Sequence, residues 1–290
     1  MPDILNHMKT IFETFKQSIY NPSFYQNATT MQVGEIIRYY WKVSLLLSII
    51  MTTALGAMLI PQGVTFVKYH APEIIKNYFP AELVINIEKG EASVNVSEPY
   101  VVPAKGGTKD VLREQGLENM LVVDTKNDFD KKKFEEHKTF ALLTRTEIVT
   151  QSDRGQITIQ DLRALPTSTI SQEWLLSWVE KVRNSLWYIV VFGLIGTFIV
   201  VLLGYLKYLV VLLLFALIPL FISYLKKTLL SYGGAYRMSL YAIIPALALK
   251  TLLNIVGVFF IPPYFTLLVF MLIISINMRD VDSPTLFENK

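Results

Sequence analysis

The stretch that decides the fold runs from Leu186 to Leu225 and reads LWYIVVFGLIGTFIVVLLGYLKYLVVLLLFALIPLFISYL. The apolar character continues to Ile276, and no Asp or Glu occurs between Leu186 and Ile276. The charged residues in this block are all basic: Lys207, Lys226, Lys227, Arg237 and Lys250. Apolar segments of about 18 or more residues are typical of helices that cross a bilayer. The sequence therefore predicts an integral membrane protein.

Composition fits a membrane region joined to one modest polar domain. The 290 residues are 52% hydrophobic and 18% charged, with a mean hydropathy of +0.40. Residues 1–42 carry a net charge of +1, residues 61–183 carry −2, and the apolar block carries +5. No basic stripe suggests binding to nucleic acid. Cysteine is absent, which excludes disulfides, thiol nucleophiles and cysteine-ligated metal sites.

The N-terminal segment, residues 1–42, is predicted to form amphipathic or interfacial helices. Asp3 is a candidate cap, and Asn21-Pro22 is expected to end the first helix. Apolar residues at spacings of three and four predict one apolar face, formed by Ile4, Leu5, Met8, Ile11, Phe12, Phe15 and Ile19. Two interpretations stay open: a helix lying in the headgroup layer, or a helix packed on the membrane spans of the protein itself.

The first span is predicted at residues 43–60. Tyr39, Tyr40 and Trp41 lie where an aromatic belt is expected. Pro61-Gln62-Gly63 is expected to end the helix. The 42-residue charged lead is too long for a cleaved signal peptide, so this span is interpreted as a retained signal anchor.

Residues 61–183 are predicted to form a small polar α+β domain. Strands are expected at 83–87, 92–96, 120–125, 146–151 and 156–160, with a Gly90 turn in the first hairpin and a Ser152–Gly155 turn in the last. A helix is expected over 128–138, with Phe129 and Phe134 facing inward. Ser171 is expected to cap a helix over 172–183, with Trp174 and Trp178 facing inward.

Residues 184–278 are predicted to form a helical membrane block of about four spans. The 40 residues from Leu186 to Leu225 are enough for two crossings, with a tight turn at 204–207. A further span is expected over 239–257 and a short last span over 264–276, followed by a polar tail at 279–290. The predicted fold class is a mostly α membrane protein: a five-span helical bundle with a small α+β extramembrane domain inserted between spans 1 and 2.

The orientation is the difficult point. Arg38 and Lys42 before the first span favour an internal N-terminus and an external polar domain. Five spans, however, would place Lys226, Lys227 and Arg237 outside, against the positive-inside tendency. The external domain is the preferred interpretation.

Two segments carry a family resemblance: residues 15–25, FKQSIYNPSFY, and residues 230–245, LSYGGAYRMSLYAIIP. They resemble bacterial integral membrane proteins of the family of unknown function 1189, one branch of which is named for maltodextrin utilisation. The order of elements is similar over most of the chain, and the C-terminal half distantly resembles five-span Yip-type membrane proteins. The resemblance implies a bacterial plasma or inner membrane, and it brings no known site residues.

Conventional catalytic and metal patterns are missing from the sequence. His7, His70 and His137 show no ligand spacing, and structural or surface roles are favoured for them. Asp124, Asp128, Asp130 and Asp153 lack the Gly and terminal Glu of a calcium loop, so capping and turns explain them better. No cofactor and no catalytic residue is predicted, and the protein is expected not to be an enzyme.

Two groups of residues are candidates for function. Lys250, with Asn254 one turn later, is a basic side chain at membrane depth with no acidic partner in the block; it could line a path, or its amine could snorkel to the interface. Tyr232, Tyr236, Arg237 and Tyr241 lie at helical spacing near a membrane boundary. They could bind headgroups or a partner, although an aromatic-belt anchor is favoured.

The preferred hypothesis is a non-enzymatic membrane protein that binds, senses or scaffolds through the external domain, with an accessory role in transport as one form of it. The expected partners are the lipid bilayer and another membrane protein such as a transporter, or a second copy of the chain. The alternative is a small transport or permeation unit that uses Lys250 and Asn254.

Overall fold

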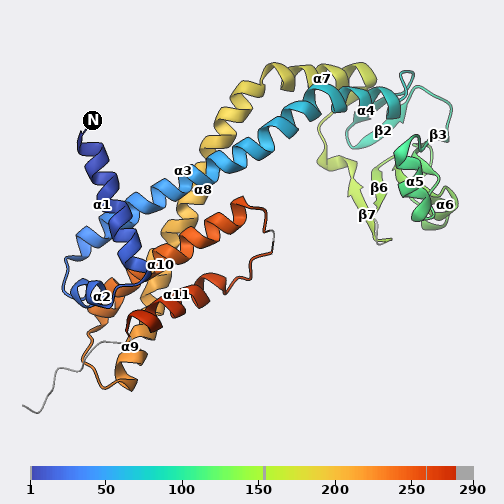
Figure 1. The fold of residues 1–290 in the computed structure, drawn as a ribbon. Coiled ribbons are helices and arrows are strands. Elements are labelled where there is room, and N and C mark those ends of the chain that lie inside the picture. Colours follow the sequence, from blue (N-terminus) through green and yellow to red (C-terminus); the bar gives the residue numbers. More distant parts are fainter. Residues whose placement is uncertain (1, 153–154, 259, 279–290) are drawn as a thin grey trace, which may run out of the picture. The chain divides into compact units, whose positions relative to one another are not determined.

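The computed structural model describes residues 2–152, 155–258 and 260–278, with side chains from residue 11 onward (Figure 1). It divides into two compact units. The helical unit comprises Met1–Ile60 and Val190–Lys290, and the α+β unit comprises Pro61–Ile189. The predicted polar tail, residues 279–290, lies outside the described residues.

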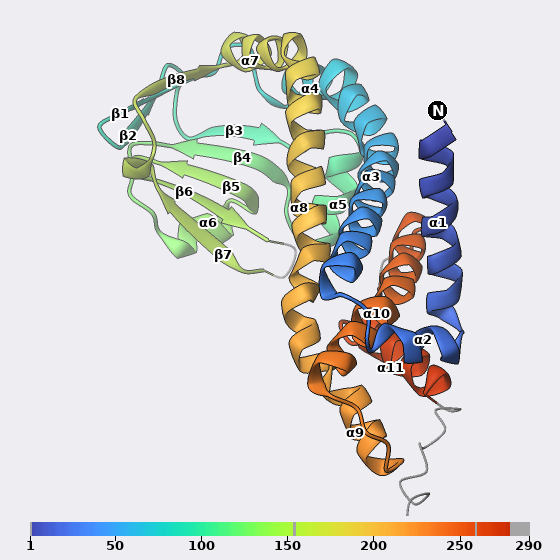
Figure 2. The same ribbon diagram turned by 90° about the vertical axis from the view of Figure 1, so that its left-hand side faces the viewer.

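The helical unit is built from seven helices in the described part of the chain. They are α1 (Pro2–Ile19), α2 (Pro22–Ala28), α3 (Val33–Thr65), α8 (Leu186–Phe215), α9 (Leu217–Leu225), α10 (Tyr232–Ile255) and α11 (Phe265–Asn277). Its core is centred on α10, whose residues from Met238 to Leu247 are all buried. Helices α10 and α11 lie side by side in both ribbon views (Figures 1 and 2).

Three helical stretches are long and apolar enough to cross a membrane: Val33–Tyr78, Leu186–Leu225 and Tyr232–Ile255. Helix α11 is apolar but has only 13 residues. The mostly helical character of the chain and its small sheet region agree with the predicted fold class. The predicted five-span bundle goes beyond these observations.

The turn predicted at 204–207 is wrong. Helix α8 continues through Gly204 and Lys207 to Phe215, and the chain breaks only at Ala216, before α9. A glycine within a strongly apolar helix does not remove a backbone hydrogen bond, so it need not end the helix. The end predicted at Pro61 is also wrong, because α3 includes Pro61 and ends at Thr65. Pro61 lies in the last turns of α3; its φ near −65° is helical, so the helix continues although the Pro61 nitrogen donates no hydrogen bond.

Helix α3 carries a row of small, buried side chains and comes close to α8 at one of them, Gly56. Ser44, Ser48, Thr52 and Gly56 recur every four residues along α3 and are all buried. A Cβ added at Gly56 would lie 2.9 Å from Leu194 Cδ2 of α8. Small residues at this spacing let membrane helices pack closely.

The first helix answers one question that the sequence left open. Helix α1 packs against α10, and Ile11 and Phe15 contact the core of the helical unit. Phe12 is 68% exposed. This packing favours the interpretation in which the N-terminal helix lies on the protein itself.

The α+β unit contains two sheets. Its strands are β1 (Val84–Glu88), β2 (Glu91–Val94), β3 (Tyr100–Pro103), β4 (Asn119–Asp124), β5 (Thr139–Thr144), β6 (Glu147–Gln151), β7 (Ile157–Asp161) and β8 (Ser168–Ser171). The strand orders are β2-β1-β8 and β3-β4-β5-β6-β7. Among the described strands, only β4 and β5 pair in parallel, with helix α6 between them in the chain. Figure 2 shows the larger sheet beside α6.

The helical elements of this unit are short. They are the π-helical segment η1 (Phe66–His70), α4 (Ala71–Tyr78), α5 (Gly107–Glu114), α6 (Lys131–Glu136), the 3₁₀ segment η2 (Leu162–Ala164) and α7 (Gln172–Asn184). One apolar cluster lies between the sheets and includes Leu83, Ile87 and Val123. A second, around Phe134 and Val149, lies between the larger sheet and α6. The unit therefore has an apolar core of its own.

Several local predictions for this unit are confirmed. The β1–β2 hairpin turns through Lys89 and Gly90, both at positive φ, and a Cβ at Gly90 would clash with Arg163. Strands β6 and β7 pair antiparallel, although residues 153 and 154 of their turn lie outside the described residues. Asp130 caps α6, and Ser171 caps α7.

The predicted inward face of the helix over 172–183 is wrong. Trp174 is 39% exposed and Trp178 is 49% exposed. Their rings contact edge to face with centroids 5.8 Å apart, and Lys181 Nζ lies 5.5 Å from the Trp178 ring. Among the described elements, helix α7 packs mainly against α4, η1 and β8. One narrow face of α7 is therefore covered.

Candidate functional site

Within the helical unit, three tyrosine hydroxyls of α3 and α10 bond to the backbone of α8. They donate to backbone carbonyl oxygens spaced four residues apart along α8, which lie on one face of that helix. The pairs are Tyr40 to Tyr205 (2.7 Å), Tyr236 to Leu209 (3.0 Å) and Tyr232 to Leu213 (2.7 Å). A carbonyl oxygen has two lone pairs, so it accepts this bond in addition to its helical one. The predicted candidates Tyr232 and Tyr236 thus bind the backbone of the protein itself.

A buried hydroxyl chain joins α8 to α10. The Tyr205 and Thr251 hydroxyl oxygens are 2.5 Å apart, and Thr251 Oγ1 lies 2.8 Å from the Leu247 carbonyl oxygen. That carbonyl can only accept, so Thr251 donates to it and Tyr205 donates to Thr251. Both side chains are at least nine-tenths buried. The chain fixes the contact between the two helices.

Arg237 holds α10 against the end of α2. Its Nη1 donates to the carbonyl oxygen of Thr29 at 2.7 Å, and Thr29 follows the last residue of α2. A cation at a helix C-terminus satisfies a carbonyl that has no partner within the helix and suits the helix dipole. A Cβ at Gly234 would lie 3.3 Å from Thr29 Cβ, which shows how closely the two segments approach.

Tyr241, the last predicted member of this group, lies in an aromatic cluster. Its ring centroid is 4.7 Å from that of Phe24 and 5.6 Å from that of Tyr39, and its hydroxyl lies 3.6 Å from Met31 Sδ. The side chain is 5% exposed. The four predicted interfacial residues are thus brought together on α10, and each contacts other parts of the helical unit.

Asn277 joins the end of α11 to the α1–α2 junction. Its Nδ2 donates to the carbonyl oxygens of Ile19 (3.0 Å) and Ile273 (2.8 Å), while its Oδ1 accepts from the Asn21 amide (2.6 Å). The residue is fully buried. Lys226 Nζ donates to the carbonyl oxygen of Met278, the residue after Asn277. Residues 19–21, 226 and 277–278 therefore lie at one end of the helical unit.

No hydrogen bond found among the described residues joins the Lys250 side chain to the Asn254 side chain. Lys250 is partly buried on α10, and Asn254, one turn later, is exposed. Neither lines any of the hollows described below. A path lined by these two residues stays a prediction.

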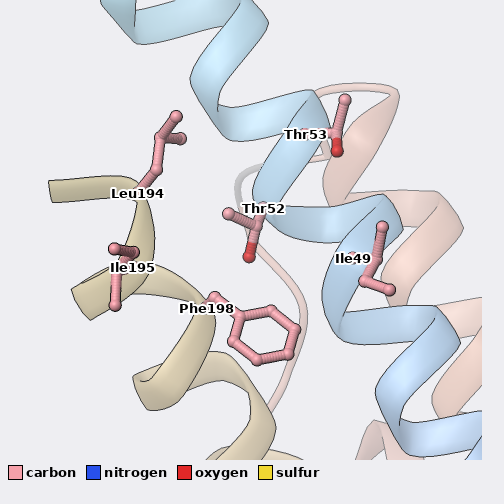
Figure 3. Close-up of a pocket in the computed structure, with 6 residues that line it drawn as sticks. All are labelled: Ile49, Thr52, Thr53, Leu194, Ile195 and Phe198. Atoms are coloured by element: carbon pink, nitrogen blue, oxygen red, sulfur yellow. The ribbon is translucent and has the colours of Figure 1, made fainter. Parts of the chain in front are cut away.

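A small hollow of about 250 Å³ lies between α3 and α8 (Figure 3). Ile49, Thr52 and Thr53 line it from α3, and Leu194, Ile195 and Phe198 line it from α8. The Thr52 hydroxyl points into this space and has no hydrogen-bond partner in the described part of the chain. Two further hollows, between α1, α3 and α10, carry both apolar and charged side chains.

Polar side chains of the α+β unit serve as caps and surface ion pairs. Asp130 accepts from the Lys132 amide (2.8 Å), and Asp128 pairs with Arg145 (2.9 Å). No group of three or more His, Asp or Glu able to hold a metal occurs among the described residues. The predicted capping role is confirmed for Asp130, whereas Asp128 forms an ion pair instead of a cap, and Asp153 lies outside the described residues.

One surface pair shows a clear electrostatic effect. The Tyr100 hydroxyl donates to Glu82 Oε1 at 2.6 Å. This bond stabilises the carboxylate and lowers the pKa of Glu82, and the same bond raises the pKa of Tyr100. Both effects are local to the surface.

The two edges of the larger sheet differ. Strand β3 ends at Pro103 with an irregular register between Val102 and Pro103, which blocks further pairing. Strand β7 has no Pro or Lys and pairs only with β6 among the described strands. Ile159, in its centre, is 49% exposed. The β7 edge is an open backbone surface.

Sequence reasoning missed Tyr40, Tyr205 and Asn277 as organising residues. The available signal was a polar side chain inside or at the end of a strongly apolar helix, which the bilayer penalises unless it is bonded. Tyr40 was assigned to an aromatic belt instead.

Comparison with known proteins gives one match. A family described as "Protein of unknown function (DUF1189)" matches residues 12–279. No curated protein and no solved structure matches the chain. Because the match covers most of the sequence, the chain belongs to the DUF1189 family.

Proposed function

We propose that this chain is a multi-pass protein of the bacterial plasma membrane that binds or senses a partner through its α+β unit, without catalysis. The observation that carries the proposal is a unit with its own apolar core, inserted between two long apolar helices. The polar side chains described above act in caps and surface pairs, which supports a binding role rather than an active site.

The course of α8 supports an external position for this unit. Its 30 residues are about 45 Å long, which suits one crossing of a hydrocarbon core of about 30 Å. One crossing returns the chain to the side of Arg38 and Lys42. Lys226, Lys227 and Arg237 then lie on that side too, so the positive-inside tendency is satisfied with the α+β unit outside.

The contacts of α11 support an even number of crossings. Asn277 contacts Ile19 and Asn21, and Met278 contacts Lys226, so α11 returns to the end at which α1 finishes. We therefore propose four membrane-inserted helices, α3, α8, α10 and α11, instead of five. Helix α11 is about 20 Å long, shorter than the core, so local thinning of the bilayer is expected there.

The binding surface that we propose is the outer edge of β7. An open edge strand can pair with an extended segment of another chain, which adds a strand to the sheet. A membrane partner such as a transporter, with an extended external loop, would fit this surface. Exposed Ile159 would supply an apolar contact beside the backbone bonds.

Site-specific photo-crosslinking in intact cells tests this function. A photoreactive residue at position 159 of the full chain is expected to give one adduct of defined mass. Val111, which is 55% exposed on α5, is the matched control position and is expected to give no such adduct. Ile157→Pro, which removes an amide that points away from β6, is expected to block the edge and remove the adduct at 159.

The same adducts at 159 and 111, or none at 159, would contradict the proposed surface. An adduct of twice the chain mass would identify the partner as a second copy of the protein. Labelling of the α+β unit from the cytoplasm only would contradict its external position.

A further inference from the structure

Two adjoining hollows in the helical unit differ in chemistry. The first has a volume of about 490 Å³ and is mainly apolar. It is lined by Ile11, Phe12 and Phe15 of α1, by Lys42, Val43, Leu45, Leu46, Leu47 and Ile49 of α3, and by Ala248 of α10. The second has a volume of about 260 Å³ and is lined mainly by polar side chains: Thr14, Glu35, Arg38, Tyr39, Lys42 and Tyr241. Ile11 and Lys42 line both, so the hollows meet at these residues.

The polar hollow carries an excess of positive charge. Arg38 and Lys42 are exposed and form no ion pair among the described residues, and Glu35 is the one acidic side chain that lines the hollow. The Tyr39 hydroxyl is buried without a hydrogen-bond partner in the described part of the chain. Neighbouring Ser18 donates its own proton to the Phe15 carbonyl oxygen (2.7 Å). The hollow thus offers two cations and, beside them, the Tyr39 hydroxyl.

The apolar hollow follows a membrane helix. It extends along α3 from Lys42 to Ile49, a rise of about 10 Å. Several of its side chains remain open to an occupant, since Leu46 is 43% and Ile49 is 46% exposed. Its volume lies within the range of small-molecule sites. An occupant must therefore have an apolar tail that follows the helix into the bilayer.

We propose that the two hollows form one site for an anionic phospholipid of the bilayer. The phosphate lies in the polar hollow beside Arg38 and Lys42, where the Tyr39 hydroxyl can donate to it. An acyl chain occupies the apolar hollow between α1, α3 and α10. The charge of the first hollow selects an anionic headgroup, and the second explains why a soluble phosphate would not suffice.

This site would also fix α1. Ile11, Phe12 and Phe15 form one wall of the apolar hollow, so a bound acyl chain fills the space between α1 and α3. Bound lipid is therefore expected to stabilise the packing of the N-terminal helix.

Lipid titration by native mass spectrometry tests the proposal with the full chain in detergent. Phosphatidylglycerol is the anionic probe, and phosphatidylcholine is the zwitterionic comparison. One phosphatidylglycerol is expected to bind at least ten-fold more tightly than phosphatidylcholine. The double variant Arg38→Gln/Lys42→Gln is expected to lose roughly thirty-fold in phosphatidylglycerol affinity, from the usual contribution of two basic residues near an anionic headgroup, and to keep its phosphatidylcholine affinity.

Two further variants separate the parts of the site. Lys207→Gln removes an exposed cation from α8, away from both hollows, and is expected to change affinity less than two-fold. Ala248→Phe fills the apolar hollow without altering its charge and is expected to lose about ten-fold. Unchanged far-ultraviolet circular dichroism checks that each variant is folded.

Equal phosphatidylglycerol affinity in the wild type and in Arg38→Gln/Lys42→Gln would overturn the proposal. So would an equal loss in Lys207→Gln, which would mean general attraction between charges. Displacement of the lipid by free glycerol phosphate would overturn the role of the acyl chain.

Discussion

The helical unit and the α+β unit use polar side chains in opposite ways. Of the 12 buried polar residues in the described chain, nine lie in the helical unit, among them Thr251 and Asn277. All ion pairs found among the described residues lie in the α+β unit, and all are substantially exposed. Lipid tails are as apolar as the helices, so burial alone does not specify how membrane helices pack.

The difference teaches where specificity comes from in each unit. In the helical unit, hydroxyl, amide and guanidinium groups bond to backbone carbonyls of other helices, as Tyr40, Arg237 and Asn277 do. In the α+β unit, apolar side chains such as Phe134 fill the space between layers, and its charged groups in ion pairs stay at the surface; its buried polar residues are the threonines Thr125, Thr139 and Thr144. Substitutions should therefore be costly at different kinds of residue in the two units.

The largest effect is expected from Phe134→Ala in the α+β unit. Phe134 is 1% exposed, and truncating a buried Phe costs about 4 kcal/mol of unfolding free energy. Limited proteolysis of the full chain should cut the α+β unit while a protected helical fragment persists. Val111→Ala, at an exposed apolar residue, serves as the control and should behave like wild type. Loss of both units together would contradict their independence.

Asn277→Ala should be the most damaging of the polar changes in the helical unit. It leaves the Ile19 carbonyl and the Asn21 amide, both in part-buried bonds, without their partner, at a cost of about 3 kcal/mol. Thermal unfolding in mild detergent measures the loss. Asn254→Ala, the same change at an exposed site on α10, should stay within about 0.5 kcal/mol of wild type. Equal effects of the two would refute the importance of the buried contact.

Gly56→Leu tests the close approach of α3 and α8. The added side chain meets Leu194 at the position where even a Cβ would be 2.9 Å away, so overpacking should cost about 2 kcal/mol. Gly193→Leu is the matched control, because a Cβ there has no neighbour within 4 Å. The thermal unfolding midpoint should fall for the first variant and not for the second.

The smallest effect is expected from Tyr100→Phe on the surface of the α+β unit. Because the pKa of Glu82 is lowered in the folded protein, its bond contributes stability above the unfolded pKa, and this contribution is lost as the pH falls through the folded value. The small difference in unfolding midpoint between variant and wild type should therefore shrink from about pH 7 to about pH 3. A difference that grows on acidification would contradict the assignment.

Much of the local structure could be predicted from the sequence. The Lys89-Gly90 turn, the β6–β7 pair and the caps at Asp130 and Ser171 follow from short-range rules, since each depends on a few adjacent residues. The apolar helices follow from composition alone. Strand β5 was missed because it is buried and flanked by charged segments, and its parallel pairing with β4 is a tertiary choice.

The contacts that organise the helical unit could not be predicted in this way. The continuity of α8 through Gly204 depends on the apolar setting, in which an open turn would leave backbone groups unpaired. Asn277 bonds to residues more than 250 positions earlier, so no local pattern marks it. The aromatic and basic residues from Tyr232 to Tyr241 were recognised as a group, but their bonds to α8 and to Thr29 required the tertiary structure.

Cysteine labelling tests the central claim most directly, because the chain has no native cysteine. Lys131→Cys lies at an exposed position of the α+β unit, and Leu229→Cys lies at a residue 79% exposed between α9 and α10. An impermeant maleimide added to intact cells should label Lys131→Cys and should label Leu229→Cys only after the cells are permeabilised. Labelling of both, protection of both, or the reverse pattern would contradict a single crossing by α8 with the α+β unit outside.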